Sequence, residues 1–252
     1  MKQINYQFHP NYKNQKDQIF QIIEKFDQIE EVVYSGKRNT LKKVTLNDQN
    51  LAIKKFHQPI IFKRIIYTKL RSSKAKRSFD NANYLLKHNI YTPQPVCYIE
   101  NYNFGLLTHA YYISIFVNYD YDFHDILHNE HINQRNDIIT GLARFTFRLH
   151  QANVLFKDHS PGNTLIKRKT EGFDYFLIDL NRMQFKPLSF DERMQNFARI
   201  TPYKWMVDLL SEEYARLIKK DKQEVFPLMW QYVSAFQKKF HRKKRIKKRL
   251  GI

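Results

Sequence analysis

The distribution of apolar and polar residues predicts a first half of the chain that is rich in strands. Residues 31–56 hold three short runs of β-branched and aromatic residues separated by polar turns, which indicates three antiparallel strands. Two further runs, at 96–100 and 106–116, flank a turn and predict another hairpin. Helical spacing of apolar residues predicts a short helix over 17–28 and one main helix around 79–86.

In the second half of the chain the apolar positions follow a helical period. The pattern over 138–149 predicts a long buried helix, and two more helices are expected over 205–218 and 224–240. Ser189 followed by Glu192 fits a capping box at the start of a further helix. One predicted hairpin, over residues 164–179, interrupts this helical region.

These elements predict an α+β fold with two lobes. We expect residues 1–117 to form an N-terminal lobe that contains a five-stranded antiparallel sheet, one main helix and the short helix at the start. Residues 118–237 should form a mostly helical C-terminal lobe. Residues 238–252 form a basic tail, in which nine of the twelve residues from 238 to 249 are Lys or Arg.

The composition of the chain indicates its compartment and the class of partners that it binds. The single cysteine, Cys97, excludes an internal disulfide and a four-cysteine zinc site, and the first residues lack the apolar core of a signal peptide. No apolar run reaches the 18 or so residues of a membrane span. These features favour the cytoplasm. The net charge of +19 indicates anionic partners, namely nucleotides, nucleic acids or acidic lipid surfaces.

Three polar residues in the second half have the layout of a phosphoryl-transfer centre. Asp158 is followed five residues later by Asn163, and Asp179 ends an apolar strand sixteen residues further on. A turn over 170–172 reverses the chain between these last two, so the return strand should bring Asp179 beside Asn163. The reaction needs one carboxylate to accept a hydroxyl proton, and an amide oxygen and a second carboxylate to hold Mg²⁺ against nucleotide phosphates.

Cationic residues in the first half are candidates for binding those phosphates. Lys54 lies on the third expected strand, where alternation places it on the opposite face from Lys55. One of these two lysines should therefore face a nucleotide, although a strand lysine is often a solvated edge residue. Gly36 and Arg38 lie in the first turn and are candidates for phosphate contacts, and an ordinary hairpin tip is the alternative.

The catalytic loop and the strand that ends at Asp179 resemble those of the lipopolysaccharide core kinases, the Kdo and heptose kinase family, which has a protein-kinase-like fold. The resemblance covers about 31–218 and is most specific at 149–166 and 89–96. It implies that Asp158 is the catalytic base and that Asn163 and Asp179 hold Mg²⁺. It also implies that Lys54 binds ATP.

The sequence departs from the kinase pattern at several positions. Phe156 replaces the usual histidine two residues before the catalytic aspartate, where apolar packing can support the loop instead. Ser160 stands where protein kinases usually have lysine, which favours a small-molecule or glycan hydroxyl as acceptor. The helix glutamate that usually pairs with the lysine falls at Ser78, and Asp80 should face away. No glycine follows Asp179, so a mobile activation segment is not expected.

The leading hypothesis is therefore an ATP- and Mg²⁺-dependent kinase. The resemblance implies that it phosphorylates a sugar of the lipopolysaccharide inner core or of a lipid A precursor. The basic tail should hold it against an anionic membrane at the inner face. A kinase for proteins or small metabolites is the second enzymatic hypothesis. A catalytically inactive kinase-like protein that binds nucleic acid is the third, but most aromatic residues lie at apolar periodic positions, so we expect no specific nucleic acid.

Overall fold

The chain folds into two compact units, residues 1–118 and 119–252, and each is described by itself. The computed structural model describes residues 2–57 and 72–250. Much of the basic connector that follows the third predicted strand lies outside the described residues.

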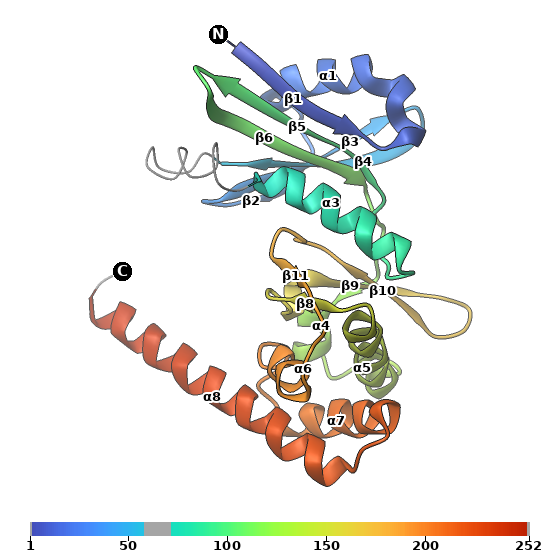
Figure 1. Ribbon diagram of the computed structural model, residues 1–252, viewed down its shortest axis with the longest axis vertical. Coiled ribbons are helices and arrows are strands. Elements are labelled where there is room, and N and C mark those ends of the chain that lie inside the picture. Colours follow the sequence, from blue (N-terminus) through green and yellow to red (C-terminus); the bar gives the residue numbers. More distant parts are fainter. Residues whose placement is uncertain (1, 58–71, 251–252) are drawn as a thin grey trace. The chain divides into compact units, whose positions relative to one another are not determined.

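The N-terminal unit is built around a six-stranded antiparallel sheet with the order β1-β5-β6-β4-β3-β2 (Figure 1). The strands are β1 (Lys2–Phe8), β2 (Val32–Ser35), β3 (Asn39–Leu46), β4 (Gln49–Phe56), β5 (Pro95–Asn103) and β6 (Leu106–Ile115). The last five are the strands expected from the pattern. The expected number of five was wrong, because β1 adds a sixth strand at the edge next to β5.

Helices cover both faces of this sheet (Figure 1). α1 (Lys16–Glu24) buries Ile19 and Ile23 in a core that includes Leu51 and Ile53 of β4. It ends earlier than expected, and a 3₁₀ turn, Phe26–Gln28, follows it. α3 (Lys74–Lys87) begins at the N-cap Ser73 and packs on β5 and β6 on the opposite face. Residues of β4 thus alternate between the α1 face and the α3 face.

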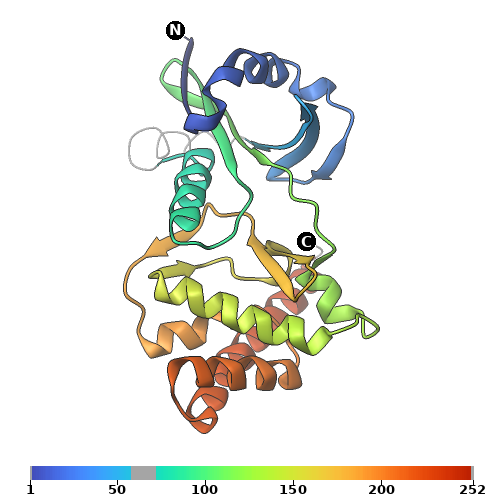
Figure 2. The same ribbon diagram turned by 90° about the vertical axis from the view of Figure 1, so that its right-hand side faces the viewer.

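The C-terminal unit is mostly helical. α5 packs against α7, and α7 packs against α8 (Figure 2). The helices are α4 (Phe123–His128), α5 (Arg135–Gln151), α6 (Phe190–Asn196), α7 (Lys204–Ile218) and α8 (Lys222–Arg249). The expected capping box at the start of α6 is present. A three-stranded sheet, β10-β9-β7, and a two-stranded sheet, β11-β8, complete this unit. These strands are β7 (Tyr121–Asp122), β8 (Val154–Phe156), β9 (Thr164–Arg168), β10 (Phe173–Leu177) and β11 (Met183–Phe185).

α8 is longer than expected and includes the basic tail. Its first half buries Val225, Met229 and Val233, which are spaced four residues apart on one face. Every residue from 238 to 250 is exposed, as the density of charge predicts. None of the helices in the described ranges is both long and apolar enough to cross a membrane.

Candidate active site

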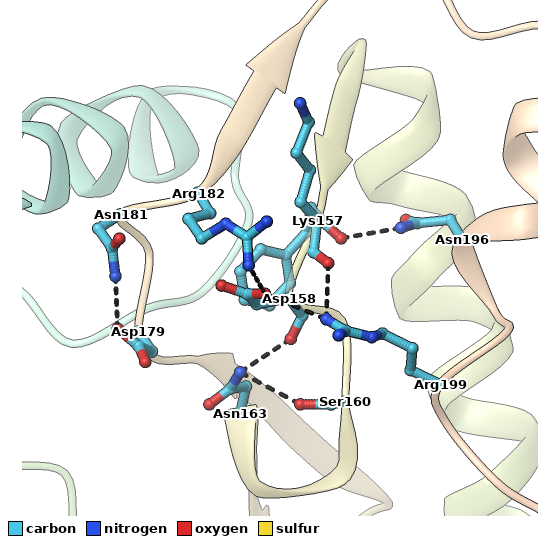
Figure 3. Close-up of polar contacts among 10 residues, drawn as sticks. Lys157, Asp158, Ser160, Asn163, Asp179, Asn181, Arg182, Asn196 and Arg199 are labelled. Carbon is cyan, nitrogen blue, oxygen red and sulfur yellow. Dashed lines mark hydrogen bonds and ion pairs between the residues drawn. The ribbon is translucent and has the colours of Figure 1, made fainter. Parts of the chain in front are cut away.

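The hairpin of β9 and β10 brings two candidate metal ligands together. Thr164 at the start of β9 pairs with Leu177 at the end of β10, so the residues just outside the hairpin are neighbours. The backbone N–H of Ile178 donates to the carbonyl oxygen of Asn163 at 3.0 Å. Asp179 follows directly, so it lies beside Asn163 as the spacing predicts (Figure 3).

Hydrogen bonds fix which way the Asn163 amide points. Its Nδ2 donates to the backbone carbonyl of Asp158 at 2.8 Å and to Oγ of Ser160 at 3.2 Å (Figure 3). Because a carbonyl can only accept, Nδ2 must occupy this position, and Oδ1 is the amide atom left to coordinate a cation. Ser160, which replaces a lysine of protein kinases, thus helps to orient the candidate metal ligand.

Asp179 adopts a backbone conformation that residues other than glycine rarely use. Its φ is +57°, in the left-handed region, where aspartate and asparagine are tolerated better than most residues. Nδ2 of Asn181 donates to Oδ1 of Asp179 at 2.7 Å and holds the carboxylate in place (Figure 3). Strained backbone of this kind concentrates at functional sites. β10 ends at Leu177, so the left-handed backbone at Asp179 lies outside the hairpin.

The residues present fit a Mg²⁺ ion held together with nucleotide phosphates. Mg²⁺ is commonly bound by one or two protein oxygens plus substrate phosphates and water, rather than by a complete protein cage. Asn163 and Asp179 supply one amide oxygen and one carboxylate. In the part of the chain that the structure describes, no cluster of three or more His, Cys, Asp or Glu side chains could hold a metal by itself.

Asp158 lies on the same loop, and two arginines contact it. Nη1 of Arg182 and Nη1 of Arg199 approach its Oδ1 at 2.7 and 3.1 Å (Figure 3). The Asp158 side chain is 18% exposed, whereas those of Arg182 and Arg199 are 53% and 40% exposed. Both contacts fall on Oδ1, so Oδ2 is the carboxylate oxygen that can accept the proton of a hydroxyl.

Buried polar residues hold the loop that carries Asp158. The side chain of Phe156 is fully buried, as expected for apolar packing in place of the usual histidine. Its carbonyl oxygen accepts a hydrogen bond from Asn196 at 2.8 Å, and Asn196 also bonds Nε2 of His150 at 3.1 Å. His159, the residue after the candidate base, bonds Thr146 of α5 at 3.0 Å. The loop is therefore anchored to α5 and α6 on both sides of Asp158.

The two histidines of this network are neutral at physiological pH. Burial lowers the pKa of His150 to about 4 and that of His159 to about 3. A neutral imidazole can donate from one nitrogen and accept at the other. These residues therefore serve as hydrogen-bonding supports of the loop, and neither is a proton carrier at neutral pH.

Lys54 and Lys55 lie on opposite faces of the sheet in the N-terminal unit, as alternation predicts. Lys55 shares the α1 face, where its Nζ lies 2.9 Å from the carboxylate of Asp27 and 5.0 Å from the ring centroid of Phe26. Lys54 shares the α3 face with Phe56, whose ring centroid lies 5.5 Å from its Nζ. Lys55 is therefore paired with the 3₁₀ turn that follows α1, and Lys54 lies on the face that the strand alternation assigned to the nucleotide candidate.

α3 carries the positions where the acidic partner of the nucleotide lysine is usually found. Ser78 is buried, and its hydroxyl donates to the carbonyl of Lys74 at 2.9 Å, so no acid occupies the usual glutamate position. Asp80 is exposed and pairs with Lys76 at 3.0 Å, consistent with a side chain that faces away. Glu100 of β5 is the buried carboxylate of this unit's described residues, and it accepts hydrogen bonds from Asn5 and Tyr102 at 2.7 and 3.0 Å.

Gly36 and Arg38 occupy the turn between β2 and β3. The N–H of Gly36 donates to the carbonyl of Asn39 at 3.1 Å, and the carbonyl of Arg38 accepts from the N–H of His57 at 3.0 Å. A Cβ on Gly36 would meet the phenol of Tyr34, with its hydroxyl oxygen 2.3 Å away. Tyr34 is exposed and its side chain can move aside, so packing within the turn does not by itself require glycine here.

Sequence reasoning missed two kinds of residues at the site. Arg182 could have been noticed, because it follows Asp179 closely on the same segment. Arg199 and Asn196 had no signal, since only the fold brings these distant positions to the catalytic loop, and the role of His150 depends on its contact with Asn196. Lys54, Gly36 and Arg38 belong to the N-terminal unit.

The chain resembles known kinases in sequence and in structure. It matches the model of the Lipopolysaccharide kinase (Kdo/WaaP) family over residues 24–226. No curated protein matches it. Among solved structures it resembles WaaP in complex with acyl carrier protein, with a TM-score of 0.65 and 12% identity over 94% of this chain and 98% of that chain. This likeness establishes the expected kinase-like fold.

Proposed function

Because the chain belongs to the Lipopolysaccharide kinase (Kdo/WaaP) family, we propose that it transfers a phosphoryl group from ATP to a sugar hydroxyl of the lipopolysaccharide inner core, on Kdo or heptose. The observation that carries this proposal is the gathering of Asp158, Asn163 and Asp179 around one loop and one hairpin (Figure 3). The N-terminal unit would be the nucleotide-binding lobe, and the C-terminal unit the catalytic lobe.

Each residue of the site has a role in this reaction. Asp158 orients the acceptor hydroxyl and accepts its proton at Oδ2. Asn163 and Asp179 hold Mg²⁺, which neutralises charge on the phosphates when it is bound. Lys54 supplies a cation for the α and β phosphates, and Gly36 and Arg38 lie in the turn that would cover them. The buried network below the loop holds Asp158 in one position, so little reorganisation is needed when the acceptor binds.

Mass spectrometry of the glycolipid tests this function in the cell. Lipopolysaccharide from cells with and without this protein should differ by the mass of one phosphate, and fragmentation should localise it to one inner-core sugar. Such a result would also name the substrate. Identical glycolipids, combined with phosphorylation of a protein or a free metabolite by the purified chain, would favour the alternative kinase.

A first prediction separates the two strand lysines. Lys54→Met should raise KM for ATP by about tenfold to a hundredfold, since a charged hydrogen bond to phosphate is lost. Lys55→Met is the matched control, because Lys55 has the same charge on the adjacent position and pairs with Asp27. It should leave KM for ATP near the wild-type value. A larger increase for Lys55→Met would assign the nucleotide to the opposite face of the sheet.

A second prediction concerns the exposed half of α8, which we propose docks on an anionic membrane surface at its inner face. Basic side chains gain affinity near anionic lipids, and Phe240, Ile246 and Leu250 are exposed and can anchor. Deleting 238–252 should lower turnover on membrane-embedded glycolipid several-fold and leave turnover on the soluble, deacylated sugar unchanged. The deletion spares Val225, Met229 and Val233, which hold α8 to its unit.

High salt should reproduce this loss in the intact protein, because it screens the attraction between basic residues and lipid. Equal losses of turnover on the membrane substrate and on the soluble sugar would instead indicate that this segment is part of the folded unit. No loss on either substrate would remove its role in substrate access.

A further inference from the structure

Positively charged side chains lie beside the candidate base, Asp158. Arg182 and Arg199 both approach the same carboxylate oxygen (Figure 3). Ion pairs as exposed as these contribute little to stability. Two guanidinium groups on one carboxylate leave a net positive charge beside the candidate base. Such a surplus favours an acceptor that is itself anionic.

The backbone of Arg182 and the side chain of Arg199 are held in place before any substrate binds. The carbonyl of Arg182 accepts a hydrogen bond from the N–H of Lys157 at 3.0 Å, next to the pairing of β8 with β11. Nη1 of Arg199 donates to the carbonyl of Lys157 at 3.2 Å, and its guanidinium lies 5.3 Å from the ring centroid of Phe236 on α8. A guanidinium fixed like that of Arg199 loses little entropy when it binds an anion.

The contacts with Asp158 occupy both guanidinium groups. Nη1 of each arginine lies on the same oxygen, Oδ1, of this carboxylate. A second anion beside the loop would compete for the same guanidinium groups. Guanidinium forks match carboxylate and phosphate oxygens in geometry, so they would exchange Asp158 for the incoming group.

Resting on the proposed function, we propose that Arg182 and Arg199 form a binding site for an anionic group next to the acceptor hydroxyl. The group is a carboxylate or a phosphate of the acceptor sugar or of its neighbour. When it binds, the guanidinium groups exchange the Asp158 carboxylate for the anionic group of the acceptor. The two arginines thereby restrict the enzyme to negatively charged acceptors.

The test uses deacylated inner-core oligosaccharide in three forms: native, carboxyl-reduced and dephosphorylated. Arg199→Met should raise KM for the native form by about tenfold to a hundredfold, with a smaller change in kcat. On the form that lacks the recognised group, wild type should already be impaired, and the variant should match it within about twofold. Which modification removes the difference identifies a carboxylate or a phosphate as the ligand.

Arg216→Met is the matched control, because Arg216 is an exposed arginine of the same unit that pairs only with Glu213 among the described residues. It should leave all three KM values unchanged. Arg199→Lys keeps the charge and should recover part of the lost affinity. Equal losses of Arg199→Met on all three forms would overturn the proposal and make the arginine a positioning residue for Asp158.

Calorimetric binding of the oligosaccharides without ATP separates this proposal from the proposed function. If wild type binds the native form and Arg199→Met weakens that binding, the anion site stands even where no phosphate is transferred. If wild type binds the native form no more tightly than the two modified forms, the proposal fails, whatever the turnover.

Discussion

Replacing Asp158 with asparagine should reduce kcat by about a hundredfold to ten-thousandfold, the range expected when a general base is removed. Asparagine has nearly the same shape as aspartate but cannot accept a proton. ATP binding should be unchanged, because the backbone carbonyl of Asp158, which bonds Asn163 at 2.8 Å, remains in place. Single-turnover phosphoryl transfer and equilibrium ATP binding, measured on the same preparation, check both parts.

The matched control for this substitution is Asp174→Asn. Asp174 lies on β10 and pairs with Lys169 at 2.8 Å on the hairpin surface. Asp174→Asn therefore removes one carboxylate from the same unit without changing the site. Its kcat should equal that of wild type. Full turnover by Asp158→Asn would show that another group accepts the proton.

Replacing Asp179 with asparagine should weaken the binding of Mg²⁺-ATP as well as turnover, because the carboxylate of one of the two candidate metal ligands becomes a neutral amide. Metal ions provide several kcal/mol of charge stabilisation, which corresponds to at least about a hundredfold in kcat/KM. Asparagine is preferable to alanine here. It tolerates the left-handed φ of +57° at this position, so the loss can be assigned to the metal and not to backbone strain.

Titration of Mg²⁺ at fixed ATP checks this prediction. The Asp179→Asn variant should need a higher Mg²⁺ concentration to reach its reduced maximum, whereas Asp158→Asn should saturate at the wild-type concentration. An unchanged Mg²⁺ dependence for Asp179→Asn would exclude this carboxylate as a metal ligand.

Five strands of the N-terminal sheet were predictable from the sequence, and the edge strand β1 was not. β1 has alternating Ile4, Tyr6 and Phe8, which is a strand signal. Six of its seven residues are exposed, however, so the segment resembled a polar terminus more than part of a core. Its pairing with β5 is a long-range contact that no local pattern specifies.

The proximity of the two candidate metal ligands was predictable because a short hairpin connects them. Asn163 and Asp179 become neighbours through β9 and β10, whose pairing follows from a local turn. Arg199 reaches Asp158 only through the packing of α6 and the loop after it, 41 residues away in the chain. Tertiary contacts of this kind leave no periodic signal in the sequence.

The positions of the aromatic residues bear on the nucleic-acid hypothesis. The largest fully buried side chains include Tyr214, Phe123, Phe145, Phe156 and Phe197, so these rings belong to the core and cannot stack on bases. Exposed rings in the described residues are spread over several elements, such as Phe104 in a turn, Trp205 on α7 and Phe240 on α8. This distribution favours the kinase hypothesis.

Phosphoryl transfer by the purified chain tests the central claim most directly. ATP labelled in its γ-phosphate, Mg²⁺ and deacylated inner-core oligosaccharide should yield labelled oligosaccharide with wild type and with Asp174→Asn. Asp158→Asn should yield label at a rate lower by about a hundredfold or more. Mass spectrometry should place the phosphate on a Kdo or heptose hydroxyl. Label in the oligosaccharide at the same rate with Asp158→Asn, or no label with wild type while ATP and Mg²⁺ bind, would contradict this account.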